Sequence, residues 1–306
     1  MRIAILNPRA GLAATRARDA LLRHPDFKDV ELRVTAAPGD AQRWAAEAGA
    51  AGADLVLAMG GDGTINEAAS GLVGTRVPLG VVPVGSGNGL ARTLGIPLQP
   101  GRALDALRDA VVRRIDVGMA NDRPFLNIAG AGLDALVGAD FHEHGRRGGR
   151  RGIFTYVRLS LRRTMSYQAE SWSLSAGGQT FEARALVVAF VNGRQWGAGA
   201  VVAPGARLDD GLLDVVLIED APFFETAWNA TRLFLGGIEK LRAYRHVAAE
   251  EAVLTATGGK QFAFHRDGEP EPPCDRVEVR LRRLALPVLV PRATAADPRG
   301  PFVTRD

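Results

Sequence analysis

The feature that most constrains the fold is a pattern that occurs three times in the first hundred residues. Each copy is a short apolar run, a glycine-containing loop and then residues with helical periodicity; the runs with their loops read RIAILNPRAG, LVLAMGGDGT and LGVVPVGSGNG. Because parallel strands need crossover connections, this alternation predicts an α/β domain with a mostly parallel sheet. Ligands bind such sheets beyond the carboxyl ends of the strands, so we expect the three loops to converge on one site.

The segments between these loops predict the helices of the first domain. Apolar residues at helical spacing predict helices over residues 12–23, 40–50, 65–72 and 102–112. In the sequence TINE, Thr64 and Glu67 fit a capping box, in which their side chains bind free N–H groups at a helix start.

After about Asp116 the sequence changes to short β-rich runs separated by Gly, Asn and Asp. Because no regular helix lies between each pair of runs, this sequence pattern predicts a second, mainly antiparallel β domain. Two helical inserts are expected in it, over residues 153–165 and 223–244. The predicted boundaries are 1–116 for the first domain and 117–287 for the second, and we expect segment 288–306 to pack back on the first.

Composition excludes several classes of protein. A chain of 306 residues, 46% hydrophobic and 24% charged, is typical of a soluble protein with two domains. It has no apolar run of 18 residues, so any membrane contact must be peripheral, and the N-terminus lacks the apolar stretch of a secretory signal. The single Cys274 excludes an intrachain disulfide and a cysteine-rich zinc site. We expect a cytoplasmic protein, with peripheral contact at the inner face of the membrane left open.

Arginines gather in one region, in RRGGRRG at residues 146–152 and at Arg158, Arg162 and Arg163 on the predicted helix that follows. A basic amphipathic helix can lie on an anionic membrane, although such a helix more often covers a core. Nucleic acid is not an expected partner, because aromatic residues are only 6% of the chain and do not interleave with the arginines.

The second glycine loop carries an acid among its glycines. Gly60, Gly61 and Gly63 favour close approach of a ligand to the backbone, and a phosphate over a helix N-terminus is such a ligand. Asp62 would repel this phosphate unless a cation lay between them, and Mg²⁺ is commonly held by one or two carboxylates with phosphate oxygens. The loop therefore predicts a site for a nucleotide with Mg²⁺ and a phosphoryl-transfer reaction.

Seven motifs in order carry a resemblance to a known family. They are NPRAG at 7–11, GGDGTINE at 60–67, PVGSGNGLAR at 83–92, RIDVG at 114–118, NIAGAGLDA at 127–135, LDDGLLDV at 208–215 and DGEP at 267–270. Together they resemble the catalytic domain shared by the diacylglycerol kinases, bacterial soluble lipid kinases and sphingosine kinases. The resemblance implies that a β-sandwich follows the α/β domain, with the active site in the cleft between them. It also implies transfer of the γ-phosphate of ATP to the hydroxyl of a membrane lipid such as diacylglycerol.

The resemblance also implies roles for individual residues. Those implied to bind ATP are Asn7, Pro8, Arg9, Ala10, Gly11, Thr35, Gly60, Gly61, Asp62, Gly63, Thr64, Ile65, Asn66, Glu67 and Ser86. Glu269 is implied to be the base that takes the proton of the lipid hydroxyl, with Asp62 acting through Mg²⁺. A β-hairpin turn at Asp267 and Gly268 is expected in either case.

Three further carboxylates have weaker implied roles. Asp116 corresponds to a residue of the magnesium and water network, and Asp134 to one on the lipid side of the site. A second, structural Mg²⁺ is implied at the Asp210 side chain with the backbone carbonyls of Arg207 and Leu212. Each of these acids also has an ordinary interpretation as a turn or strand-end residue.

One departure from the family keeps alternatives open. Many bacterial diacylglycerol kinases carry GTxND in the third loop, whereas this chain has GSGNG, with Gly89 in place of the aspartate. A kinase for a sphingoid base or another lipid and a non-catalytic nucleotide- or lipid-binding regulator are therefore alternatives. An NAD kinase, which shares the GGDGT loop and a related plan of two domains, is a third alternative, which the GSGN, DGEP and LDDGLLDV motifs disfavour. The acceptor lipid is left open, as is the oligomeric state, with a homodimer as one alternative. The five histidines show no relay pattern in the sequence.

Overall fold

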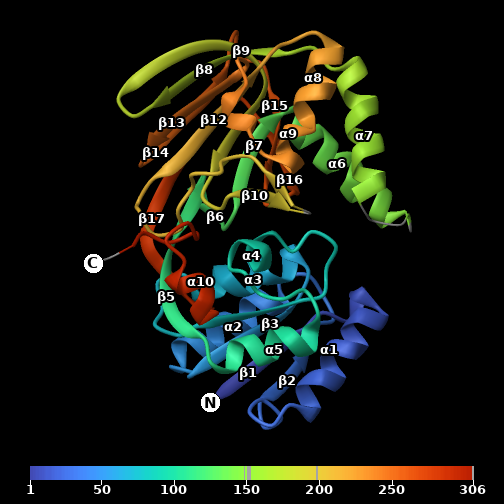
Figure 1. Ribbon diagram of the computed structural model, residues 1–306, viewed down its shortest axis with the longest axis vertical. Coiled ribbons are helices and arrows are strands. Elements are labelled where there is room, and N and C mark those ends of the chain that lie inside the picture. Colours follow the sequence, from blue (N-terminus) through green and yellow to red (C-terminus); the bar gives the residue numbers. More distant parts are fainter. Residues whose placement is uncertain (148, 150–152, 198, 305–306) are drawn as a thin grey trace. The chain divides into compact units, whose positions relative to one another are not determined.

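The computed structural model describes residues 1–147, 149, 153–197 and 199–304 (Figure 1). The chain divides into two compact units. Unit 1 comprises Met1–Val117, Arg207–Gly211 and Arg282–Asp306, and unit 2 comprises Gly118–Ala206 and Leu212–Leu281. Strands β5 (Val111–Ala120) and β17 (Arg276–Val290) each begin in one unit and end in the other. Of the arginine-rich run 146–152, residues 148 and 150–152 lie outside the described residues.

Unit 1 is built on a parallel sheet. Its strands β1 (Arg2–Leu6), β2 (Glu31–Val34), β3 (Leu55–Gly60) and β4 (Leu79–Pro83) lie in the order β2-β1-β3-β4, and β17 joins β4 at Val288. Every residue of β3 and β4 is buried, as expected for a parallel sheet that is covered on both faces. The predicted α/β class is therefore confirmed.

Helices cover both faces of this sheet. The chain moves from β1 to β2 in one direction along the sheet, and from β2 to β3 and β4 in the other. Right-handed crossovers then place α1 (Leu12–Arg23) on one face and α2 (Asp40–Ala50) with α3 (Asp62–Leu72) on the opposite face. Contacts between α2 and α3, and between α1 and α5 (Pro100–Arg108), agree with this arrangement.

The helix predictions in unit 1 hold for α1 and α2, whose bounds are those expected, and fail in part elsewhere. The capping box is wrong, because α3 begins at Asp62 with Gly61 as its N-cap and no side chain caps it. The helix predicted over residues 102–112 begins at Pro100, ends at Arg108 and gives way to β5 at Val111. Proline suits the first helical position, since its missing N–H would have no partner there. Short helical turns η1 (Pro8–Ala10), α4 (Gly89–Thr93) and α10 (Arg292–Ala296) complete the unit.

Unit 2 is antiparallel throughout its described strand pairs, which confirms the predicted class. Its strands are β6 (Arg123–Phe125), β7 (Ile128–Gly132), β8 (Glu170–Ala176), β9 (Gln179–Val191), β10 (Gln195–Gly197), β11 (Ala200–Val201), β12 (Leu213–Glu219), β13 (Tyr244–Ala249), β14 (Glu251–Ala256), β15 (Phe262–Arg266) and β16 (Glu269–Cys274). The main path runs β16-β15-β7-β9-β8-β14-β17, and β12 pairs with both β9 and β13.

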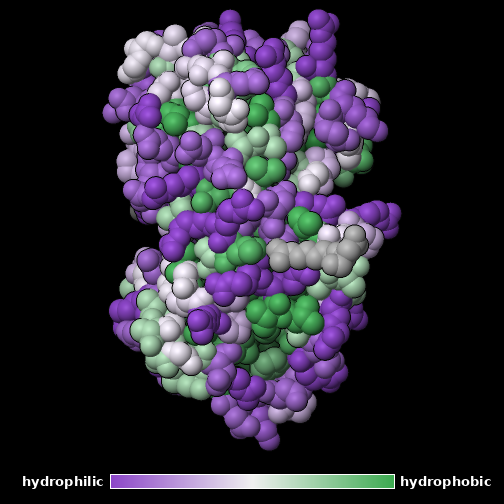
Figure 2. Space-filling view, turned by 90° about the vertical axis from the view of Figure 1, so that its left-hand side faces the viewer, coloured by the Kyte–Doolittle hydropathy of each residue, from purple (hydrophilic) through white to green (hydrophobic). Residues whose placement is uncertain are grey.

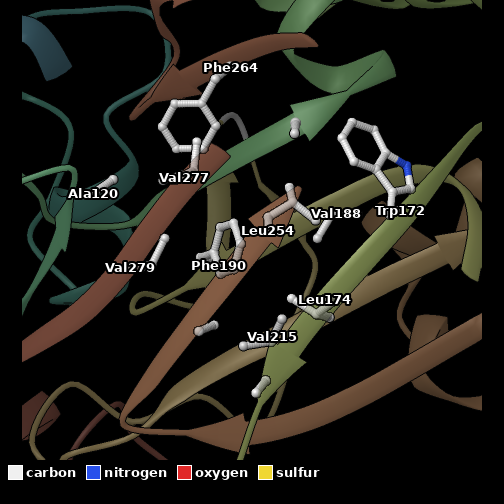
Figure 3. Packing of buried hydrophobic residues seen from close by; sticks show 14 of the residues in the cluster. Ala120, Trp172, Leu174, Val188, Phe190, Val215, Leu254, Phe264, Val277 and Val279 are labelled. Atoms are coloured by element: carbon white, nitrogen blue, oxygen red, sulfur yellow. The ribbon is translucent and has the colours of Figure 1, made fainter. Parts of the chain in front are cut away.

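Strand β9 is buried on both faces over its second half. Val188 and Phe190 belong to one apolar cluster, whereas Val187, Ala189 and Val191 belong to another, because successive side chains of a strand point to opposite faces. Figure 3 shows the first cluster, in which side chains from several strands pack together. In the same cluster, the rings of Trp172 and Phe262 pack edge to face, with their centroids 5.0 Å apart. Helices α6 (Leu133–Arg146) and α9 (Arg232–Leu235) contribute to the second cluster.

The helices of unit 2 differ from prediction in two places. Helix α7 (Ile153–Ser166) agrees with the predicted 153–165. The single helix predicted over 223–244 is wrong: α8 (Phe223–Ala230), α9 (Arg232–Leu235) and η2 (Ile238–Lys240) replace it, and β13 begins at Tyr244. Gly236 and Gly237 both have positive φ, which ends the helical path. Helix α6 (Leu133–Arg146) was not predicted, because glycines interrupt its apolar pattern.

The surface is mainly polar on the face shown in Figure 2, where apolar side chains form small separate areas. Within the described part of the chain, no helix is long and apolar enough to cross a membrane. Most large apolar side chains of the described residues are buried in the cores of the two units.

Candidate functional site

Asp62 joins the second glycine loop to the third. It is the first residue of α3, and its two carboxylate oxygens accept the N–H groups of Asn88 at 2.8 Å and Gly89 at 2.7 Å. Burial raises the pKa of the Asp62 carboxyl, while these two hydrogen bonds act in the opposite direction. Asp62 therefore holds the third loop against the start of α3.

The backbones of the two loops lie in direct contact. A Cβ atom at Gly85 would lie 2.6 Å from Cα of Gly61, and a Cβ at Gly60 would lie 2.4 Å from Cβ of Thr64. Asn88 has a φ of 54°, and its side chain bonds both the N–H and the carbonyl of Gly85. Close packing therefore requires glycine at Gly60 and Gly85, quite apart from any ligand.

Gly85→Ala is expected to lower the free energy of unfolding by about 1–3 kcal/mol, because the new methyl group would push the Gly61 backbone away. Gly101→Ala on α5 is the matched control, since nothing lies within 4 Å of a Cβ at that position. Urea denaturation of both variants measures the effect. Equal midpoints for Gly85→Ala and the wild type would contradict the packing described here.

The first loop is tied to the second by Asn7. Its side-chain N–H donates to the Thr64 hydroxyl at 2.9 Å, and its side-chain oxygen accepts the N–H of Arg9 at 3.0 Å. Pro8, Arg9 and Gly11 are exposed and Ala10 is half-buried. The structure thus brings NPRAG, GGDGT and GSGNG together at the carboxyl ends of β1, β3 and β4.

The remaining residues predicted to bind ATP differ in exposure. Ser86 is exposed, and Thr35, Gly63, Asn66 and Glu67 are half-buried. Thr64 and Ile65 are buried, and the Ile65 side chain belongs to the core of the unit. Ile65 has no exposed surface, and its N–H donates to the carbonyl of Gly61 at 3.1 Å.

Asp40 orders the segment that follows Thr35. Its carboxylate accepts the N–H groups of Ala36 and Ala37, each at 2.9 Å, and the Arg43 guanidinium donates to it at 3.0 Å. The bonds from Ala37 and Ala36, followed by that from Arg43, lower the pKa of Asp40 to about 2.

This shift predicts a pH dependence for Asp40→Asn. Because the folded-state pKa is depressed, the stabilisation from the charged carboxylate is present above its ordinary value of 3.8 and is lost as pH falls through about 2. The variant should be less stable than the wild type at neutral pH, and the difference should shrink towards pH 2. Denaturation at several pH values tests this, with the exposed Asp19→Asn on α1 as control; a difference independent of pH would contradict it.

In unit 2, the predicted hairpin turn joins β15 to β16. Asp267 and Gly268 have φ of 49° and 83°, the left-handed values that a two-residue hairpin needs, so the turn prediction is confirmed. The Asp267 carboxylate accepts three backbone N–H groups, from Leu126 at 2.7 Å, Asn127 at 2.8 Å and Ile128 at 3.0 Å. These bonds fix the turn to the start of β7.

Glu269 follows this turn directly, and its side chain is about half exposed. Its carboxylate lies 3.2 Å from Nδ1 of His142 on α6, in a contact that the sequence did not predict. Since α6 itself was missed, no sequence signal pointed to His142. The pair places an imidazole beside the carboxylate implied to be the base.

Asp134 is buried beneath the same turn. It accepts a hydrogen bond from Nε2 of the buried His265 at 2.9 Å, and Nδ1 of His265 accepts the N–H of Gly268 at 3.2 Å. Because Nδ1 is an acceptor, the imidazole proton is assigned to Nε2, which donates to Asp134. His265, also missed, stands two residues before the turn in FHRDG, which is the signal that could have identified it.

Asp116 and the LDDG turn form a separate cluster in unit 1. The buried Asp116 carboxylate accepts the N–H groups of Gly211 at 2.7 Å and Leu284 at 2.6 Å. Burial raises its pKa, against the effect of these bonds. Asp116 thereby holds the turn to β17, and it does so from within β5 rather than from the end of a strand.

The predicted structural magnesium site lies in this turn. Asp210 is half-buried, while the Arg207 guanidinium donates to carbonyls of the C-terminal segment, including that of Phe302 at 3.0 Å. Among the residues that the structure describes, no group of three or more His, Cys, Asp or Glu side chains could hold a metal ion. A set of one carboxylate and two carbonyls offers only oxygen ligands, which suits Mg²⁺. The second magnesium site therefore stays a prediction.

Comparisons with known proteins agree across both units. The model of the diacylglycerol kinase catalytic domain matches residues 2–120, and that of the YegS C-terminal NAD kinase beta sandwich-like domain matches residues 127–290. A protein of Pseudomonas aeruginosa strain PAO1 named "Probable lipid kinase YegS-like" is 39% identical over 263 residues, which cover 85% of this chain and 84% of that protein. One of the same name from Pseudomonas putida is 39% identical over 210 residues, covering 68% and 69%.

Solved structures show the same fold. A diacylglycerol kinase from Bacillus anthracis superposes with a TM-score of 0.72 at 21% identity, and another structure from that organism with a TM-score of 0.79 at 24% identity. Each match covers 95% of this chain and 97% of the other. With the family models, they confirm an α/β domain followed by an antiparallel β-sandwich.

Proposed function

The chain belongs to the YegS-like lipid kinases with a diacylglycerol kinase catalytic domain, and we propose that it transfers the γ-phosphate of ATP to a hydroxyl group of a membrane lipid such as diacylglycerol. The observation that carries the proposal is the joining of three glycine loops at the start of α3. The free N–H groups at a helix N-terminus bind phosphate, and the adjoining loops offer exposed backbone and side chains for the rest of a nucleotide.

Unit 1 would hold the nucleotide. We assign the phosphates to the backbone at Gly61 and Gly63, with Asn7 and Ser86 lining the same site. Magnesium, when bound with ATP, would neutralise charge on the transferring phosphate. Since both Asp62 oxygens accept backbone N–H groups, we propose that Asp62 acts on that ion through ordered water rather than as a direct ligand.

Glu269 would act as the general base. Its carboxylate is accessible and stands on a turn that Asp267 fixes by three hydrogen bonds, so it can be held in position for the lipid hydroxyl. His142 beside it can stabilise the charged carboxylate before the proton is taken up. Transfer would be direct, because Cys274 is the single cysteine and burial raises the pKa of its thiol, which disfavours the nucleophilic thiolate.

The deciding experiment uses ATP labelled at the γ-phosphate. The purified protein is incubated with this ATP, Mg²⁺ and a total lipid extract, and in a second reaction with NAD, and the products are separated. Label in a lipid supports the proposal, and pure diacylglycerol and sphingoid bases then identify the acceptor. Label in NADP would show an NAD kinase instead, and nucleotide binding without any transfer would show a non-catalytic regulator.

A further inference from the structure

We propose that helices α7, α8 and α9 of unit 2 form a surface that docks on an anionic lipid bilayer. The inference rests on the proposed function, because it supplies the means by which a membrane lipid reaches the kinase. We call these three helices the docking surface.

The docking surface carries an unusual share of exposed apolar side chains. In the described part of unit 2, every large apolar side chain that is well exposed lies on these helices: Val157, Leu161, Met165, Trp228, Phe234 and Leu235. Met165 is 73% exposed, Trp228 69% and Leu235 81%. Large apolar side chains that are exposed together in one region mark interaction sites more often than ordinary surface.

These side chains lie on adjoining elements. Val157, Leu161 and Met165 follow one another at four-residue steps, so they form a single stripe along α7. Helix α7 contacts α8, and α8 contacts α9. Figure 1 shows α7 and α8 side by side at one edge of the strands of unit 2.

The charge of the docking surface fits an anionic partner. Arg158, Arg162 and Arg232 are exposed and, among the described residues, form no ion pair. Arg163 is bound instead to Asp140 on α6, at 2.6 Å. The sequence of α7 contains no acid, and Glu225 is the single acid in the three helices.

This combination favours a bilayer over a protein partner. Long arginine side chains beside an apolar stripe can reach lipid phosphates while the apolar groups enter the acyl region, and an exposed tryptophan is typical of the membrane interface. Helices α8 and α9 have only eight and four residues, so the exposed apolar side chains of the docking surface do not lie along one long helix face.

Vesicle flotation of the full chain tests the proposal. The wild type should float with vesicles that contain equal amounts of phosphatidylcholine and phosphatidylglycerol, and bind phosphatidylcholine alone more weakly. Arg158→Glu/Arg162→Glu should weaken binding to the anionic vesicles about tenfold or more, since both charges are reversed. Leu161→Glu/Trp228→Glu should weaken it as well. Arg76→Glu/Arg102→Glu, the same charge change on exposed residues of unit 1, should bind like the wild type.

Kinase assays separate this proposal from the proposed function. With a short-chain diacylglycerol dissolved in water, the docking variants should keep the wild-type rate, whereas phosphorylation of diacylglycerol in vesicles should fall. Wild type that floats but phosphorylates neither form would overturn the proposed function alone. Folded docking variants that bind anionic vesicles like the wild type would overturn the docking surface. Variants that bind vesicles normally but no longer associate with one another would overturn it too, because the surface would then be a contact between copies of the chain.

Discussion

Glu269→Gln is expected to lower kcat for phosphate transfer to lipid by about 10²- to 10⁴-fold, the usual contribution of a general base. The amide has the size of the carboxylate but cannot take the proton of the lipid hydroxyl. The dissociation constant for ATP should change little, because the loops assigned to the nucleotide are in unit 1. Initial rates and equilibrium ATP binding measure the two quantities.

The control for this variant is Glu251→Gln, which changes an exposed strand glutamate of the same unit. It should leave both quantities near the wild-type values. A Glu269→Gln protein with an undiminished rate on vesicle and dissolved lipid would remove Glu269 from the proposed mechanism. A protein that loses ATP binding would assign Glu269 to the nucleotide site instead.

Asp62→Asn is expected to affect both stability and activity. One of its terminal atoms would become an NH₂ group facing the N–H of Asn88 or Gly89, so two donors would oppose each other where one bond is now made. We expect the free energy of unfolding to fall by about 1–3 kcal/mol without any nucleotide present. We also expect kcat/KM to fall by more than about tenfold, because the third loop would move.

Two measurements distinguish the roles assigned to Asp62. Urea denaturation without nucleotide or Mg²⁺ reports its hydrogen bonds to the third loop, and the kinase assay reports both those bonds and its action on the metal. Unchanged stability with lost activity would leave only the second role. The exposed Asp29→Asn serves as control and should change neither.

Much of the fold followed from local patterns. The strand, glycine loop and helix order predicted the parallel sheet, and the bounds of α1 and α2 were correct, because apolar periodicity and breakers are local properties. The turn at Asp267 and Gly268 was also correct, because few residues other than Asp, Asn and Gly accept its positive φ. The failures at Thr64 and over 223–244 are errors in where a helix begins or ends.

The candidate site could be predicted only in part from the sequence. Asn7, Asp62 and Glu269 were named from their motifs, yet the partners of their side chains were not. The Thr64 hydroxyl was interpreted as a helix cap and is instead the acceptor for Asn7. His142 and His265 were missed, since an isolated histidine has no pattern of its own and α6 was not recognised.

The sequence by itself determined the alternation of strands and helices in the first domain, the β-rich nature of the second, the positions of the glycine loops and the family, because these depend on residue types at short spacing. Only the tertiary structure decided that Asp62 bonds Gly89, 27 residues away, and that Asp267 bonds Leu126, 141 residues away. A carboxylate accepts any N–H that packing brings within reach, so its partner depends on which distant segments lie together. The joined loops and the braced turn of Glu269 are consequences of that packing.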